Sequence, residues 1–97
     1  MSKVGEHVTL DIIGTSKEYE PKFFEKLVYK IAKKAKVTVL EISKYKFEPQ
    51  GFTLVALLAE SHISFHTFPE KGIICFDFFT CGKVSPSVAI DIIKKEF

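Results

Sequence analysis

Two short apolar runs separated by three polar residues constrain the fold of this chain more than any other feature. The runs are Phe52 to Ala59 and Ile63 to Phe68, and the residues between them are Glu60, Ser61 and His62. Both runs are largely apolar and free of proline and internal glycine, which is typical of buried strands. The sequence therefore predicts two antiparallel strands that meet at this polar triplet.

The triplet itself has a simple interpretation and a functional one. The simple one is a polar hairpin turn. However, a carboxylate, a hydroxyl and an imidazole between two core strands are costly unless each has a partner or a task. Further acid-base and nucleophilic side chains follow at His66 and Cys81. The residues alone therefore indicate a small domain with a cluster of Ser61, His66 and Cys81, with the plain turn as the alternative.

The rest of the chain predicts three more strands and two helices. The strands are His7 to Ile13, Val37 to Lys44 and Ile73 to Phe79, the last one following a turn over residues 69–72. The first helix starts near Pro21, and its apolar stripe is Phe24, Leu27, Val28, Ile31 and Ala35, at the helical spacing. The second helix follows Ser85 as N-cap and Pro86 as first helical residue, with its own apolar stripe.

The resulting order is β-α-β-β-β-β-α, which predicts an α+β fold: a two-layer sandwich with an antiparallel sheet packed on two helices. A chain of 97 residues forms one domain, residues 1–97. The strands between residues 52 and 79 are apolar on both faces. We therefore expect a second subunit or a ligand pocket to cover the face that the helices leave open.

Composition excludes several classes of partner. The formal net charge is +2 with both signs mixed along the helices, so no clustered basic face for nucleic acid is expected. No run of 18 apolar residues and no signal-peptide core occur, which predicts a cytosolic protein without a membrane partner. The two cysteines have no C-x-x-C or His/Cys ligand spacing, so we expect free thiols and no metal.

The segment ALLAESHISFHTFPEKG, followed by FDFFTCG, closely resembles the prokaryotic S-adenosylmethionine decarboxylases, which are pyruvoyl enzymes that cleave their own chain. The resemblance is specific over Pro49 to Gly82 and looser over His7 to Ile13 and the helices. It implies a decarboxylase (a carboxy-lyase) that converts S-adenosylmethionine into the aminopropyl donor for spermidine. The relatives usually form two-fold dimers, so a homodimer of processed units is expected.

The resemblance also implies how the chain would be processed. The Ser61 hydroxyl would attack the carbonyl of Glu60 in an N-to-O acyl shift, a step for which a serine needs proximity or a base. His66 would accept the α-proton of residue 61, and Thr53 would support the step with its hydroxyl. The products would be a 1–60 chain and a 61–97 chain that begins with a pyruvoyl group.

Roles in catalysis follow from the same family. The pyruvoyl carbonyl at residue 61 would form a Schiff base with the substrate amine and accept electrons as pyridoxal phosphate does elsewhere. Cys81 would return a proton to the substrate. Phe47 and Phe68 would bracket the adenine, and Glu70 would accept hydrogen bonds from the ribose hydroxyls.

Two other functions remain open at this stage. A pyruvoyl arginine or ornithine decarboxylase would share the fold and chemistry, but it would need an acidic group for the distal cation. A non-processing homologue that binds a ligand would be expected to lack Ser61, His66 or Cys81, and all three are present. Relatives generally continue past the last helix into at least one more strand, whereas this chain stops at Phe97. We therefore expect either a minimal member of the family or a chain whose remaining sheet edge is completed by a partner chain.

A few polar residues receive no catalytic role from the sequence. Asp11 is expected at a solvated strand position and Cys75 in the core. His62 lies on the same strand face as Ser64 and His66 by alternation, and its role is open. His7 is unassigned.

Overall fold

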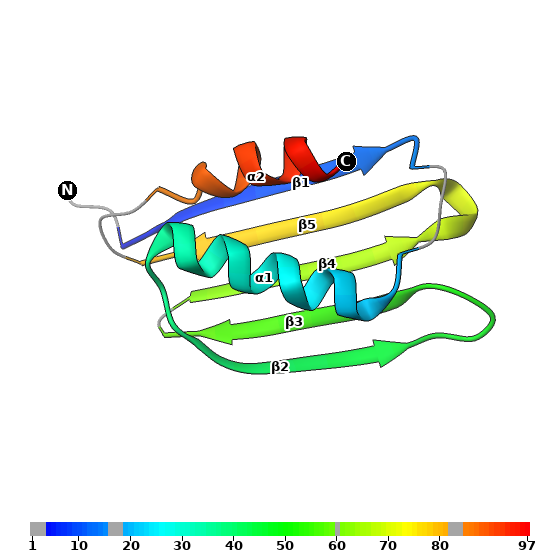
Figure 1. The fold of residues 1–97 in the computed structure, drawn as a ribbon, viewed down its shortest axis with the longest axis horizontal. Helices are drawn as coiled ribbons and strands as arrows, with labels where there is room; N and C mark the ends of the chain where they lie inside the picture. Colours follow the sequence, from blue (N-terminus) through cyan, green and yellow to red (C-terminus); the bar gives the residue numbers. More distant parts are fainter. Residues whose placement is uncertain (1–3, 16–18, 60, 82–84) are drawn as a thin grey trace.

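The computed structural model describes residues 4–15, 19–59, 61–81 and 85–97. Five strands form one antiparallel sheet in the order β1-β5-β4-β3-β2, and two helices lie on one face of it (Figure 1). This confirms the predicted α+β architecture and element order. The elements are β1 (Glu6–Ile13), α1 (Pro21–Ala35), β2 (Val39–Lys46), β3 (Phe52–Leu58), β4 (Ser61–Phe68), a 3-10 turn η1 (Pro69–Lys71), β5 (Ile73–Thr80) and α2 (Val88–Glu96).

The core lies between the sheet and the helices because each strand alternates its side chains between two faces. Side chains such as Leu54, Phe65 and Phe78 point towards the helices and are fully buried. The stripe predicted on α1 covers them, and all five of its residues are buried. Burial of this continuous apolar layer is the main favourable term that holds the two layers together.

We call the sheet face opposite the helices the open face. Residues paired directly across neighbouring strands share a face, and three cross-strand rows of the open face contain polar side chains. These rows are His7–Phe79–His62–Leu57, Thr9–Asp77–Ser64–Val55 and Asp11–Cys75–His66–Thr53. Val55 and Leu57 are exposed here. Among the described residues, no helix packs on this face (Figure 1). That a second subunit or a ligand covers it stays a prediction.

Several element boundaries differ from the prediction. β4 begins at Ser61, two residues before its predicted start, and β2 ends at Lys46, two residues after its predicted end. The starts of β2 and α2 also differ. Lys36 ends α1 in a left-handed conformation, and the Val37 N–H bonds to the Ala32 carbonyl. Residue 37 is therefore used in closing the helix, and β2 begins at Val39. Similarly, α2 begins at Val88, because Ser85 closes a separate turn by accepting hydrogen bonds from the N–H groups of Ser87 and Val88.

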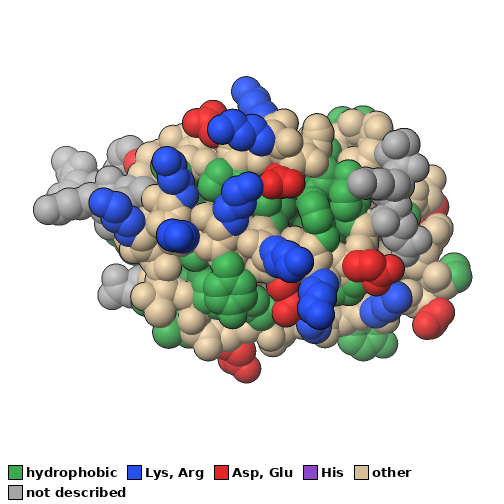
Figure 2. Space-filling model, viewed as in Figure 1, with side chains coloured by type: hydrophobic (Ala, Val, Ile, Leu, Met, Phe, Trp, Pro, Cys, Tyr) green, Lys and Arg blue, Asp and Glu red, His purple; other side chains and the backbone are tan. Residues whose placement is uncertain are grey.

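The outer surface of the helices is rich in lysine, as Figure 2 shows for the face seen in Figure 1. A groove of about 790 Å³ between α1 and α2 is lined mainly by lysines, among them Lys30, Lys33 and Lys95. It contains none of the residues that the sequence predicts for catalysis or recognition. No helix in the described ranges is long and apolar enough to cross a membrane.

Candidate active site

Ser61 and Cys81 lie together at one end of the sheet. Ser61 opens β4 directly after the connection from β3, and its side chain is buried. Cys81 follows the last residue of β5, the neighbouring strand, and its backbone N–H donates to Ser61 Oγ at 3.3 Å. Glu60, the predicted residue on the other side of the cleavage point, lies outside the described residues. The antiparallel pairing of β4 and β5 therefore brings together two predicted catalytic residues that are 20 positions apart.

His66 and Thr53 form a second pair, on the open face. They are directly opposite each other on β4 and β3, and Thr53 Oγ1 lies 2.9 Å from His66 Nδ1 in a hydrogen bond. Such a bond holds the imidazole ring in one orientation. The contact is of the kind expected from a threonine that supports a histidine base.

The predicted recognition residues gather around this second pair. A cavity of about 320 Å³ is lined by Thr53, His66, Phe47, Phe68 and Glu70, together with Gln50, Phe52 and Thr67. Gly51, which also stands beside this cavity, has a backbone φ of 88°, a conformation that favours glycine. A Cβ at this position would lie 2.9 Å from the Thr67 carbonyl oxygen, so a larger residue would not fit. Three phenylalanine rings, an imidazole and a carboxylate around one hollow can hold a ligand with both apolar and polar parts.

Within one chain, these two groups of residues are far apart. His66 lies five residues beyond Ser61 on β4, which corresponds to about 16 Å along an extended strand. The two side chains also leave opposite faces, since Ser61 points to the helix side and His66 to the open face. The Ser61, His66 and Cys81 cluster suggested by the sequence is therefore divided into a nucleophile half with Ser61 and Cys81 and a cavity half around His66.

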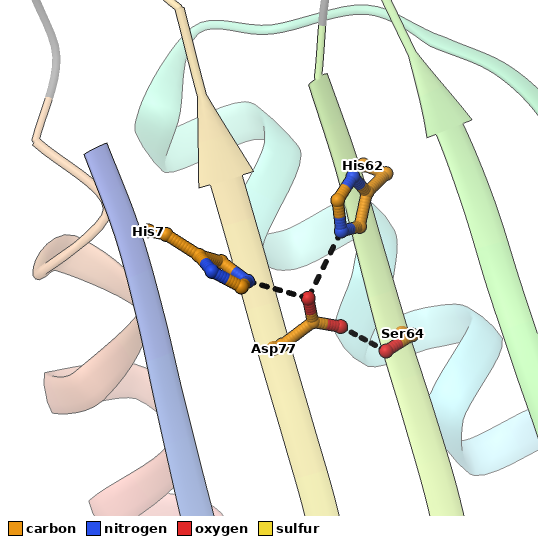
Figure 3. Close-up of polar contacts among 4 residues, drawn as sticks. All are labelled: His7, His62, Ser64 and Asp77. Atoms are coloured by element: carbon orange, nitrogen blue, oxygen red, sulfur yellow. Dashed lines mark hydrogen bonds and ion pairs between the residues drawn. The ribbon is translucent and has the colours of Figure 1, made fainter. Parts of the chain in front are cut away.

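A third polar group lies on the open face near the nucleophile half, and the sequence did not reveal it. Asp77 on β5 lies between His7 on β1 and His62 on β4 (Figure 3). Its Oδ2 is 2.6 Å from His7 Nε2 and 2.9 Å from His62 Nε2, and its Oδ1 accepts a hydrogen bond from Ser64. A carboxylate in the middle of the apolar run from Ile73 to Phe79 was the signal that could have found it, because such a group needs a partner.

These contacts change the acidity of Asp77. Partial burial acts to raise its pKa, but the hydrogen bonds from Ser64, His7 and His62 outweigh burial and hold the pKa below its ordinary value. Asp77 is therefore ionised throughout the neutral range, and the carboxylate stabilises the three side chains around it.

We expect Asp77→Asn to lower the free energy of unfolding at pH 7 by about 1 to 3 kcal/mol, since it removes hydrogen bonds to a charged group. Because the folded-state pKa is depressed, this stability is present above the unfolded pKa of about 3.9 and is lost as the pH falls through the folded value. Urea unfolding at pH 7 and at pH 3 measures the difference. The exposed Asp11→Asn variant is the control. An equal loss at both pH values would contradict the electrostatic origin.

The remaining assignments from the sequence have mixed outcomes. Asp11 is exposed on β1, as predicted. Cys75 is a free, half-buried thiol on the open face opposite Asp11, so the prediction of a core position was wrong. Burial, with a hydrogen bond and a charge contribution from Asp11, raises the pKa of the Cys75 thiol. Strand alternation placed Cys75 on the opposite side from the core residues Phe76 and Phe78.

Comparison with known proteins links this arrangement to one family. The model of the S-adenosylmethionine decarboxylase family matches residues 6–97. The chain is 40% identical over 96 residues to the S-adenosylmethionine decarboxylase proenzyme of Symbiobacterium thermophilum, covering 96% of this chain and 73% of that protein. It is 41% identical over 85 residues to that of Methanococcus vannielii, covering 86% and 70%. The crystal structure of the adenosylmethionine decarboxylase from Aquifex aeolicus superposes with a TM-score of 0.81 at 35% identity, covering 94% and 78%.

Proposed function

The chain belongs to the S-adenosylmethionine decarboxylase family, and we propose that it is a self-processing, pyruvoyl-dependent enzyme that decarboxylates S-adenosylmethionine to supply aminopropyl groups for spermidine. The observation that carries the proposal is the contact between Ser61 and Cys81. A buried serine at the junction of two core strands, with a thiol residue beside it, is the arrangement that the proposed cleavage and protonation steps need.

Ser61 is the proposed nucleophile of self-cleavage, with Glu60 as the residue before the cut. Cleavage would give a 1–60 chain with β1, β2 and β3 and a 61–97 chain with β4 and β5. In the sheet order β1-β5-β4-β3-β2, the two strands of the second chain lie in the centre, between strands of the first. Hydrogen bonds along both outer edges of this central pair would keep the cleaved chains together.

The surroundings of residue 61 fit a pyruvoyl group derived from Ser61. The Cys81 N–H donates to Ser61 Oγ, the atom that would attack the Glu60 carbonyl and later leave with the 1–60 chain, so the contact would hold the nucleophile in place before cleavage. When present, the group supplies an electron sink for the carbon–carbon bond that breaks in decarboxylation. The thiol of Cys81, whose backbone touches residue 61, is the proposed proton donor to the substrate.

The substrate would bind in the cavity half. Phe47 and Phe68 offer ring faces for an adenine, and Glu70 offers acceptor oxygens for ribose hydroxyls, all around the same hollow. Aromatic faces also attract a sulfonium cation such as the one in S-adenosylmethionine. His66 is the proposed proton acceptor in processing, held by Thr53.

A complete site requires the nucleophile half of one chain and the cavity half of another. Because about 16 Å of strand and the sheet itself separate Ser61 from His66, one chain cannot join them. We therefore propose a two-fold homodimer in which the open faces meet. The Ser61 side chain points to the helix side, but residue 61 is the first residue of β4, so its main chain lies at the end of the sheet. Two-fold symmetry would place this end of the sheet against the partner's cavity half, and the apolar Val55 and Leu57 would be buried between the chains.

Leu57→Lys is expected to weaken this dimer at least about 10-fold, since it places a charge where an apolar side chain would be buried. The matched control is Tyr29→Lys on α1, because Tyr29 is 57% exposed and Leu57 is 50% exposed. Sedimentation equilibrium measures both. A Leu57→Lys dimer as strong as the Tyr29→Lys dimer would show that the open face is not the interface.

The intact mass of the purified protein under denaturing conditions tests the proposed function. We expect two fragments split between Glu60 and Ser61, with a carbonyl on residue 61 that reacts with phenylhydrazine. The cleaved protein should release carbon dioxide from S-adenosylmethionine and not from arginine or ornithine. A single chain that persists on long incubation would contradict self-processing, and activity on the two other amino acids alone would contradict the substrate. The cytosolic location and the lack of nucleic-acid or membrane partners remain predictions from the sequence.

A further inference from the structure

The proposed reaction uses none of the side chains that meet at Asp77. His7, His62 and Asp77 come from three adjacent strands, β1, β4 and β5, and their ligating atoms all lie within 4.8 Å of one another. Both imidazole Nε2 atoms point to the same carboxylate oxygen, Oδ2, rather than one to each oxygen (Figure 3). Three potential ligands therefore converge on one point at the surface of the sheet.

The donor set suits a metal ion of the zinc type. Two imidazole nitrogens and one carboxylate oxygen are ligands that Zn²⁺ accepts, and a fourth position would be left for water or another donor. Bonds of about 2.0 Å in a tetrahedron place the donor atoms about 3.3 Å apart. The observed separations from Oδ2 are 2.6 and 2.9 Å, so each histidine would have to withdraw from Oδ2 by less than about 1 Å. The two imidazole nitrogens lie within 4.8 Å of each other and would adjust towards the same separation.

The surroundings support such a site in two further ways. Ser64 donates a hydrogen bond to Oδ1 of Asp77, which orients the carboxylate from behind as second-shell groups do in metal sites. In the single chain the side chains of His7 and His62 are 48% and 42% exposed, so packing within the chain does not hold either ring against the small adjustment. In the proposed dimer the site would lie at the interface of the open faces. On these observations, we propose that His7, His62 and Asp77 bind one divalent transition-metal ion, with Zn²⁺ as the best match.

The position of the site suggests what the ion would do, and this part rests on the proposed function. After cleavage, His62 would be the second residue of the 61–97 chain, next to the new terminus, whereas His7 belongs to the 1–60 chain. The ion would join the freed end of β4 to β1 across β5. It would thereby restrain residue 61, which the proposed reaction needs in a fixed position.

Metal analysis of the wild-type protein tests the site. The protein, free of any histidine tag, is dialysed against Zn²⁺ or Co²⁺ and the bound metal is counted. We expect one ion per chain and a Co²⁺ spectrum without the charge-transfer band of a thiolate ligand, which excludes Cys75 and Cys81 as the ligands. Zn²⁺ should also raise the Tm by about 5 °C or more at saturation.

Variants identify the ligands. His62→Gln, Asp77→Asn and His7→Gln should each weaken Zn²⁺ binding by about 100-fold or more, and Ser64→Ala by about 10-fold. Asp11→Asn, a carboxylate on the same face outside the cluster, should bind as the wild type does. Because His7 is exposed and lies on an edge strand, His7→Gln tests the site even where the other variants fail to fold.

Two results would overturn the proposal: a wild-type chain that retains no ion, or ligand variants that bind with wild-type affinity. In either case the cluster would be a hydrogen-bonded network only. The outcome is separable from the proposed function, since a cleaved and active protein without metal disproves the site alone. Conversely, an uncleaved chain that binds one ion through these ligands disproves the self-processing alone.

Discussion

A chain carrying Ser61→Ala is expected to remain a single polypeptide of 97 residues, whereas the wild type separates into fragments 1–60 and 61–97. The substitution removes the one hydroxyl that the proposed acyl shift requires, and neither water nor a neighbouring side chain replaces it at that position. Decarboxylation should be lost completely along with cleavage, since no carbonyl can form at residue 61. Intact mass spectrometry and phenylhydrazine labelling measure both effects.

The control for this prediction is Ser87→Ala, which changes an exposed serine at the start of α2 and should be cleaved normally. Circular dichroism of the Ser61→Ala chain should match that of the wild type, because the substitution only replaces a buried hydroxyl group by a hydrogen atom. If the Ser61→Ala chain were still cut after residue 60, the cut would come from a contaminating protease and self-processing through Ser61 would be wrong.

The second large effect concerns the division of the site between two chains. Ser61→Ala and His66→Ala chains should each remain uncleaved when expressed alone. Expressed together, they should form mixed dimers in which the His66→Ala chain supplies Ser61 and its partner supplies His66. That pairing restores one complete site per mixed dimer, so random association should leave about a quarter of all chains cleaved. Only the His66→Ala chain should yield fragments.

Different tags on the two chains allow the mixed dimers to be isolated before their masses are measured. In that fraction about half of the chains, all of the His66→Ala type, should be cleaved. Adding Leu57→Lys to both chains should abolish the rescue if dimers form through the open face. Mixed dimers that form but show no cleavage would mean that His66 does not act across the interface. If the His66→Ala chain were cleaved when expressed without its partner, His66 would not be needed for processing.

The sequence determined the architecture because local pattern and global fold agree. Alternating strand residues and the helical spacing of Phe24, Leu27 and Ile31 follow from burial on one side of each element, which is a local property. The stripe on α1 and the order of elements were predicted correctly for this reason. Two of the boundaries that shifted, at Val39 and Val88, depend on hydrogen bonds that close the adjoining turns, and residue type alone does not encode these.

The candidate residues were found from the sequence, but their arrangement was not. The residues alone indicated a cluster of Ser61, His66 and Cys81, and the resemblance supplied their roles. Only strand register shows that Cys81 reaches Ser61 while His66 lies five residues further along on the other face. Sequence distance misled here, since five residues of strand span more space than the 20 residues that return along the neighbouring strand.

The cluster around Asp77 shows the same limit most clearly. His7 and Asp77 are 70 positions apart, and no spacing rule connects them, so the sequence left His7 unassigned and Asp77 unnoticed. The register of β1 on β5 and of β5 on β4 brings them within hydrogen-bond distance. The amino-acid sequence by itself therefore determined which faces are buried and which reactive residues exist. The tertiary structure decided which of them meet, because contacts between strands depend on pairing across the sheet and not on separation along the chain.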